Sequence, residues 1–226
     1  MSFASSGLEP ISSVSRRDGV INEIRRGIIL GNLRPGQKLT EIQLAESLAV
    51  SRPTIREALN QLAQEGLLIQ EPYKGLRVAD VTAKDVFDIA ETRIALDVLA
   101  TRCIYEDKTG RRLDMVRQAW EEYKEFEFDP DPFIRHEEHV NFHKKIWMAS
   151  ENSLLIKLWP VTQAHITIAL AQDQERRADP QRAHGLHETL VEEILSCDLV
   201  RAEAAFIKHT MVSAKELMTL MEPEKK

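Results

Sequence analysis

Residues 51–59 read Ser51-Arg52-Pro53-Thr54-Ile55-Arg56-Glu57-Ala58-Leu59. Serine is a favoured N-cap residue, so this stretch predicts a helix that begins just after Ser51. Arg52 and Arg56 are four residues apart and therefore share one face of that helix. With Thr54 near its start and an apolar stripe on its opposite face, such a helix is suited to the major groove of DNA. Ser51, Arg52, Thr54 and Arg56 are therefore candidate DNA-binding residues.

The segments before this helix complete a helix-turn-helix pattern. Residues 41–49 predict a short helix, and only Val50 and Ser51 separate it from the basic helix. A longer amphipathic helix is predicted over residues 14–30 and ends at Gly31, a typical C-cap residue. Helix, tight turn and basic helix, in this order, are typical of DNA-binding motifs.

Two short strands are predicted after the basic helix. Gly66 ends that helix, and aliphatic runs at residues 67–69 and 76–78 flank a hairpin tip, Pro72-Tyr73-Lys74-Gly75. Residues 14–80 therefore predict a winged helix-turn-helix domain, preceded by a mobile, serine-rich arm at residues 1–13.

The charge distribution agrees with a DNA-binding first part in spite of a net charge of -6. Residues 1–80 hold ten Lys/Arg against nine Asp/Glu (+1), and residues 81–226 hold twenty against 27 (-7). Phosphates are neutralised locally, so a near-neutral domain binds DNA when its cations share one face. Arg34, Lys38, Lys74 and Gly75 are the further candidates for that face; the alternative is that these cations are ordinary solvated charges.

The pattern over residues 14–80 resembles the GntR family of bacterial transcription regulators. The resemblance is carried, without a gap, by Gly31, Leu33, Pro35-Gly36, Leu39, Glu41, Leu44-Ala45, Leu48, Val50-Ser51-Arg52, Ile55, Arg56-Glu57-Ala58-Leu59, Leu62, Glu65-Gly66-Leu67 and Gly75. It implies a dimeric regulator that places two winged helices on the half-sites of a palindromic operator in double-stranded DNA.

Residues 81–222 predict a second, all-helical domain, followed by a charged tail at residues 223–226. Six helices are expected, at about residues 82–104, 113–123, 133–149, 154–177, 180–196 and 198–221. Asp129-Pro130-Asp131-Pro132 is the clearest break between them. The fold class is therefore mainly α: a winged helix-turn-helix followed by an antiparallel all-α bundle.

Composition favours a cytoplasmic protein. No stretch of 18 apolar residues is present to span a membrane, and residues 1–10 lack the features of a secretory signal. The two cysteines, Cys103 and Cys197, form no disulfide framework, which fits a reducing compartment. We expect both to be buried as small apolar residues.

Four histidines of the second domain have the spacing of a metal site. His139 and His143 are four residues apart and project from one helical face. His187 and His209 are each eleven residues from Asp198, so a helical hairpin that turns at Asp198 would place them face to face. Four imidazoles meeting inside the bundle would bind a first-row transition metal. The alternative is that each histidine is a packed or surface residue.

The second domain also resembles the FCD effector domain of the FadR branch, in its shorter, six-helix VanR-like form. The residues that carry this resemblance are Arg93, Leu96 and Asp97, then Val140-Asn141-Phe142-His143, Ala149-Ser150 and Asn152, and finally His187, Asp198, Ala202, Ala205 and His209. The resemblance implies a dimerising domain whose metal is bound through positions 139, 143, 187 and 209 and whose pocket accepts a small effector.

One position departs from the FCD pattern, because His139 stands where that family usually has Asp. Glu138 is rotated by about 100° on the helix and does not replace it. Four neutral ligands would leave the full +2 charge on the metal, favouring a carboxylate effector and Zn²⁺ or Ni²⁺ over Mn²⁺. The alternative is a site with three histidines, in which His139 no longer ligates.

Arg93 and His184 are the candidate effector-binding residues. Arg93 is a suitable carboxylate partner, and the alternative is an ion pair with Asp97, four residues on. His184 precedes His187 by about one turn and would line the pocket. His136 and His165 have no matching family position and are expected not to ligate.

We therefore expect a transcription regulator, most simply a repressor, that responds to a small organic acid. Two alternatives remain: a metal-dependent enzyme, since a histidine-bound metal activates water, and a regulator whose metal is purely structural.

Overall fold

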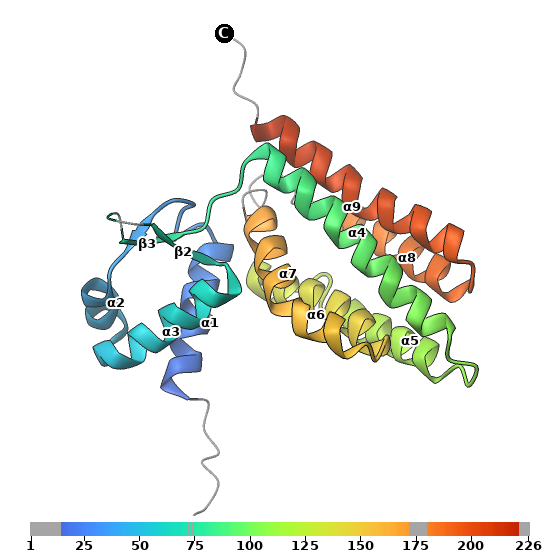
Figure 1. The fold of residues 1–226 in the computed structure, drawn as a ribbon, viewed down its shortest axis with the longest axis horizontal. Helices are drawn as coiled ribbons and strands as arrows, with labels where there is room; N and C mark the ends of the chain where they lie inside the picture. The colour runs from blue at the N-terminus through green and yellow to red at the C-terminus, as the bar shows by residue number, and fades with distance from the viewer. Residues whose placement is uncertain (1–14, 72, 74, 172–179, 222–226) are drawn as a thin grey trace, which may run out of the picture.

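The computed structural model describes residues 15–71, 73, 75–171 and 180–221. The predicted N-terminal arm, Lys74 and the charged tail lie outside the described residues. Within the described part, a small unit of three helices and three strands is followed by six further helices. The mainly α fold class predicted from the sequence is therefore confirmed (Figure 1).

The three helices of the first unit begin and end close to the predicted positions. They are α1 (Arg16–Ile29), α2 (Glu41–Leu48) and α3 (Arg52–Glu65). The side chain of Ser15 caps α1 by accepting a hydrogen bond from the Asp18 amide at 3.1 Å. Gly66 ends α3 in the left-handed conformation (φ 91°), which glycine adopts at little cost.

The wing is a three-stranded antiparallel sheet with strand order β1-β3-β2. The predicted hairpin strands are β2 (Leu68–Glu71) and β3 (Gly75–Val78), in a register that pairs Leu68 with Val78. The short strand β1 (Lys38–Leu39) was not predicted, because two residues are too few to show the alternation that identifies a strand.

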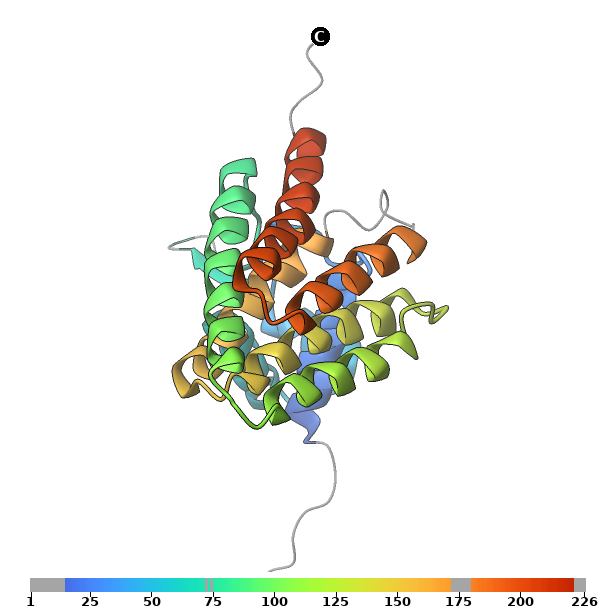
Figure 2. The ribbon, with the colours of Figure 1, turned by 90° about the vertical axis from the view of Figure 1, so that its right-hand side faces the viewer.

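The second unit contains α4 (Ala83–Tyr105), α5 (Arg111–Lys124), α6 (Pro132–Ala149), α7 (Ser153–Ala171), α8 (Pro180–Leu195) and α9 (Leu199–Met221). Thr82 and Asp85 form a reciprocal capping box at the start of α4. Asp198 caps α9 through the Val200 amide at 2.9 Å, as the predicted hairpin requires. The long helices α4 and α9 lie side by side (Figures 1 and 2). The predicted extension of α7 beyond Ala171 lies outside the described residues.

One hydrophobic core joins the winged helix to the helical unit. Ile55 and Leu59 of α3 belong to the same buried cluster as Ala90 of α4, Ala164 of α7 and Ala214 of α9. Because packed interiors transmit displacement, a movement of α4 or α9 would reach the winged helix through this core.

The expectation for the cysteines was wrong. Cys103 is half-buried and Cys197 is exposed. Cys197 does not lie inside a helix; it occupies the turn between α8 and α9 with a φ of 58°. Among the described helices, none combines the length and the apolar character that crossing a membrane requires.

Candidate functional site

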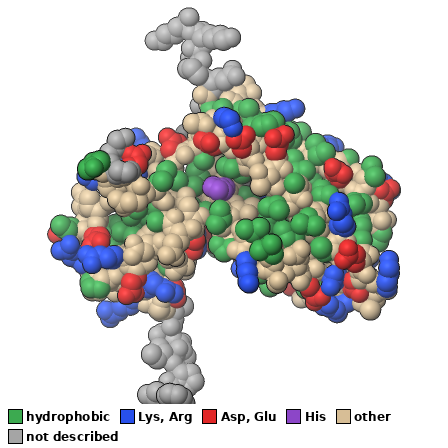
Figure 3. Space-filling model, viewed as in Figure 1, with side chains coloured by type: hydrophobic (Ala, Val, Ile, Leu, Met, Phe, Trp, Pro, Cys, Tyr) green, Lys and Arg blue, Asp and Glu red, His purple; other side chains and the backbone are tan. Residues whose placement is uncertain are grey.

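The start of α3 presents the two candidate arginines to solvent. The side chains of Arg52 and Arg56 are each 59% exposed. Ser51 occupies the N-cap position, but its side chain does not cap the helix; its hydroxyl instead lies 2.9 Å from the hydroxyl of Thr54. Lysine and arginine side chains gather at the end of the winged helix formed by α2 and α3 (Figure 3).

Both arginines contact Glu41, the first residue of α2. Arg56 donates to Glu41 through two atoms, Nε to Oε1 at 2.7 Å and Nη2 to Oε2 at 2.9 Å. Arg52 Nη2 lies 3.6 Å from Glu41 Oε2. The hydrogen bond from Arg56 lowers the pKa of Glu41, so this carboxylate is ionised. Sequence reasoning did not single out Glu41 as a site residue, because its contact joins two helices.

Of the remaining candidate cations, Arg34 and Lys38 are described and lie near the wing. Lys38 is exposed on β1, and a Cβ at Gly75 would lie 3.5 Å from its Cε. Gly75 itself has a φ of 86°, which disfavours any other residue. Arg34 is exposed in the turn before β1, where its amide donates to Gln37 Oε1 at 2.9 Å. Lys38 therefore lies beside Gly75 in the wing. Lys74 lies outside the described residues.

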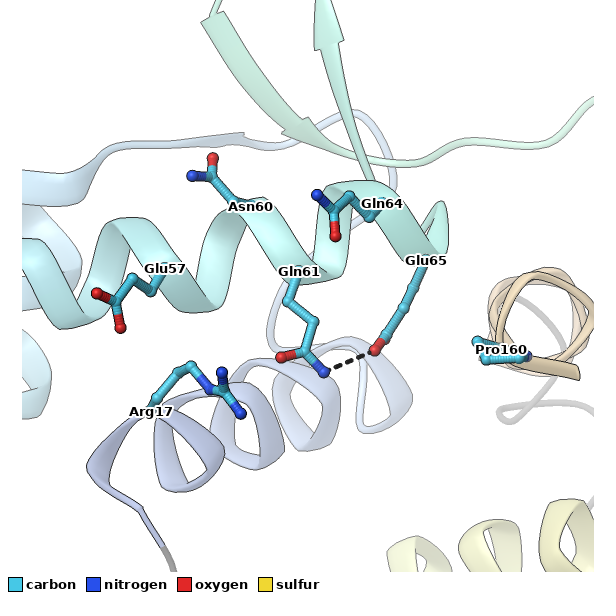
Figure 4. Close-up of a pocket in the computed structure, with 7 residues that line it drawn as sticks. All are labelled: Arg17, Glu57, Asn60, Gln61, Gln64, Glu65 and Pro160. Atoms are coloured by element: carbon cyan, nitrogen blue, oxygen red, sulfur yellow. Dashed lines mark hydrogen bonds between the residues drawn. The ribbon is translucent and has the colours of Figure 1, made fainter. Parts of the chain in front are cut away.

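A solvent-open cleft of about 550 Å³ lies on another face of α3 (Figure 4). Its lining consists of Arg17, Glu57, Asn60, Gln61, Gln64, Glu65 and Pro160. Gln61 Nε2 donates to Glu65 Oε1 at 3.1 Å within it. The candidate histidines do not line this cleft, so it is distinct from the candidate metal centre.

The four predicted histidines come together inside the helical unit. His139 and His143 come from α6, His187 from α8 and His209 from α9. One ring nitrogen of each lies within 4.8 Å of those of the other three. Ring centroids are 4.9 Å apart for His139 and His143 and 4.6 Å apart for His187 and His209. The structure thus brings together the four side chains that sequence spacing selected.

Burial keeps three of these imidazoles in the neutral form that binds metals. It lowers the pKa of His139, His143 and His209 well below the usual value, and nearby Arg93 adds to the lowering. His143 Nε2 and His209 Nε2 are 3.2 Å apart. Within the described part of the chain, the Nδ1 atoms of both rings have no hydrogen-bond partner. Four clustered imidazoles, two of which have a buried Nδ1 without a partner among the described residues, are a donor set that fits Zn²⁺ or Ni²⁺.

Two other histidines lie apart from this cluster. His136 is buried on α6 with its Nε2 3.3 Å from Thr167 Oγ1, and burial lowers its pKa to about 4. His165 faces the winged helix, where a Cβ on Gly66 would lie 3.9 Å from its Nε2. Neither belongs to the group of four.

Because these histidines are buried, we expect the metal-free protein to lose stability in mild acid. Their pKa is lower in the folded than in the unfolded chain, where it is near 6.5. The unfolded chain therefore takes up more protons as pH falls below 6.5, and stability falls with it. We expect each histidine to contribute a slope of up to about 1.4 kcal/mol per pH unit between its two pKa values.

Urea unfolding of metal-free protein between pH 7 and pH 4 measures this slope. For His136 the window extends down to about pH 4, so His136→Gln should reduce the slope across it. Stability that does not change with pH over this window would contradict the buried, neutral histidines.

Arg93 forms the ion pair that was the alternative to effector binding, and it lies beside the histidines. Its Nε is 3.3 Å from Asp97 Oδ2, and both side chains are buried. Asp97 Oδ1 also accepts from Trp147 Nε1 at 2.6 Å. Burial raises the pKa of Asp97, against the opposing influence of Arg93. Arg93 Nη2 has no hydrogen-bond partner among the described residues, so it retains a donor for a ligand.

His184 lies beside a buried carboxylate that sequence reasoning missed. Its Nδ1 is 2.5 Å from Glu127 Oε2, and its ring stacks on Trp120 with centroids 5.7 Å apart. Glu127 is 3% exposed, and burial raises its pKa. Glu127 follows the end of α5 in a non-helical turn, where no periodicity marks a residue as buried.

Comparison with known proteins gives two family matches. Residues 16–78 match the family described as bacterial regulatory proteins, gntR family, and residues 88–211 match the FCD domain. Among similar proteins, the Nta operon transcriptional regulator of Aminobacter aminovorans is 31% identical over 159 residues, which cover 70% of this chain and 74% of that one. The probable D-xylose utilization operon transcriptional repressor of Paenarthrobacter nicotinovorans is 27% identical over 193 residues, covering 85% and 83%.

The fold is shared with a solved structure. E. coli McbR/YncC matches with a TM-score of 0.73 over 93% of this chain and 100% of that one, at 20% sequence identity. At this identity the match shows a common architecture, in which a winged helix precedes a helical domain.

Proposed function

Because the chain belongs to the GntR family of bacterial regulatory proteins and carries the family's FCD domain, we propose that it is a transcription repressor whose DNA binding responds to a small carboxylate. The effector would bind at a transition metal held by the four clustered histidines. The observation that carries this proposal is the approach of four imidazole nitrogens, three of them on buried residues, to within 4.8 Å of one another.

The DNA-binding half of the proposal rests on α3 and the wing. Arg52, Thr54 and Arg56, with Ser51, would enter the major groove, and Lys38 and Gly75 would approach the backbone. Arg34 and Lys74 would add phosphate contacts. Acting on DNA, the protein would work in the cytoplasm.

A homodimer would place two such heads on a palindrome. Large apolar side chains are exposed along α7 at Leu154, Leu158 and Val161, which are spaced to share one helical face. Apolar side chains also gather over this region in Figure 3. Burial of this face against a second copy would support the dimer.

The histidine cluster supports the metal half of the proposal. His139, His143, His187 and His209 would hold Zn²⁺ or Ni²⁺, because borderline metals prefer imidazole nitrogen. The bound cation would supply a positive charge that attracts a carboxylate. Arg93 Nη2 and His184 would hold the rest of the effector. The match to the FCD domain adds to this reading.

The shared core offers a route from the effector to the DNA. His209 lies on α9, and further along the same helix Ala214 and Leu217 pack in the core that includes α3. Arg93 lies on α4, and Ala90, one turn earlier, packs in that core too. A ligand that shifts α4 or α9 would therefore change the populations of two placements of the winged helix.

The test is a titration of metal-loaded protein on its DNA site with a panel of small carboxylates. We expect one carboxylate to change the dissociation constant for DNA by about 5- to 150-fold, the usual range of allosteric coupling. The matching amide should have no effect, because it lacks the negative charge. The effector should be recovered unchanged.

Two results would favour the other hypotheses. No response to any carboxylate, with the domain unfolding when the metal is removed, would indicate a structural metal. Turnover of the carboxylate would indicate an enzyme, although the matched families and relatives are regulators.

A further inference from the structure

We propose that Glu41 is a positioning residue that orients Arg56 to read one guanine in each half-site. This inference rests on the proposed binding of DNA by α3. Glu41 contacts both arginines of the basic surface. Without a positioning role, its negative charge there would only repel phosphate.

The hydrogen-bond pattern determines which edge of Arg56 is free. Glu41 accepts from Nε and from Nη2, the two atoms on one side of the guanidinium. A guanidinium carries five N–H groups in a rigid plane, so Nη1 and the second hydrogen of Nη2 remain at its outer edge. Guanine presents O6 and N7 in the major groove, and a pair of arginine N–H groups at this spacing binds both acceptors.

Glu41 is better fixed than an ordinary surface carboxylate. It is the first residue of α2, next to Thr40, whose hydroxyl accepts from the Gln43 amide at 3.3 Å. Its side chain is 27% exposed, compared with 59% for Arg56. The contact joins two helices, so the orientation of the guanidinium follows from the packing of α2 on α3. A flexible arginine held in this way loses less conformational freedom on binding a base.

The ion pair of Glu41 and Arg56 has opposite effects on general DNA affinity and on base selectivity. A carboxylate beside phosphates weakens the attraction that all sequences share. A fixed guanidinium strengthens the discrimination of one base. Removing the charge of Glu41 should therefore raise or leave unchanged the affinity for unselected DNA, while lowering selectivity at one position. If Glu41 only stabilised the fold, its replacement would weaken binding to every DNA sequence.

Selection from a random duplex library compares the wild-type protein with Glu41→Gln. The wild-type protein should enrich a palindrome with guanine at one symmetric position. Glu41→Gln should reduce the guanine preference at that position by about fivefold or more, the lower range for loss of a bidentate contact, and should bind an unselected duplex at least as tightly. Glu46→Gln is the matched control, because Glu46 is an exposed residue of the same helix; it should keep the guanine preference.

The second variant is Arg56→Lys. Lysine keeps the positive charge but lacks the planar guanidinium that binds two acceptors at once. It should lose guanine preference at the same position as Glu41→Gln. The proposal is overturned if Glu41→Gln keeps the wild-type guanine preference, or if the two variants lose preference at different positions. A wild-type protein that enriches no sequence would instead overturn the proposed DNA binding itself.

Discussion

Replacing both Arg52 and Arg56 with alanine is expected to weaken binding to the selected DNA site by about 30- to 20,000-fold. An arginine that contacts a base contributes about 1–3 kcal/mol, and the two residues share one face of α3. Both side chains are exposed and held at the start of the helix by Glu41. Fluorescence anisotropy with a labelled duplex, at one fixed salt concentration, measures the change.

The control for this double variant is Arg117→Ala with Arg201→Ala. These arginines are also exposed, at 53% and 59%, but they lie on α5 and α9. The control removes the same charge from the helical domain and should leave affinity nearly unchanged. If the variant of α3 bound the site as tightly as this control, the assignment of α3 to the major groove would be wrong.

Replacing His143 and His209 with alanine is expected to lower the affinity for Zn²⁺ by more than about 100-fold. Loss of residues that only support metal ligands already costs about 10–100-fold, and these two side chains would be ligands themselves. Both are buried, and their Nε2 atoms are 3.2 Å apart. Competition with a chromophoric chelator at neutral pH measures the affinity.

His136→Gln is the matched control for the metal site. His136 is buried on the same helix as His143 but lies outside the cluster of four. Its variant should keep wild-type affinity for Zn²⁺, and circular dichroism should show that both the double variant and His136→Gln are folded. Equal Zn²⁺ affinity in the double variant and the wild-type protein would mean that the metal does not bind at these histidines.

The winged helix was predictable because its elements carry local signals. Ser15, Gly31 and Gly66 mark helix ends, and the apolar stripe of α3 identifies its buried face. β1 was missed because it is only two residues long. The contact between Glu41 and Arg56 joins residues 15 apart on different helices, and such a contact depends on packing that a single sequence does not show.

The histidine cluster was predictable for a different reason. The spacing of His139 and His143 follows helix geometry, and the equal distances of His187 and His209 from Asp198 follow from a hairpin. Glu127 carried no such signal, because it lies in a turn and meets His184 only through the fold. The prediction of burial failed at Cys197 because this residue occupies the turn between α8 and α9, where its side chain is exposed.

Sequencing of host genomic fragments captured by the purified protein tests the proposed sequence-specific DNA binding. We expect enrichment of one or a few palindromic sites, and loss of that enrichment when Arg52 and Arg56 are replaced. The genes beside those sites would point to the class of carboxylate to use in the titration. Capture without enrichment of any sequence, by both metal-loaded and metal-free protein, would contradict the proposed function as a transcription regulator.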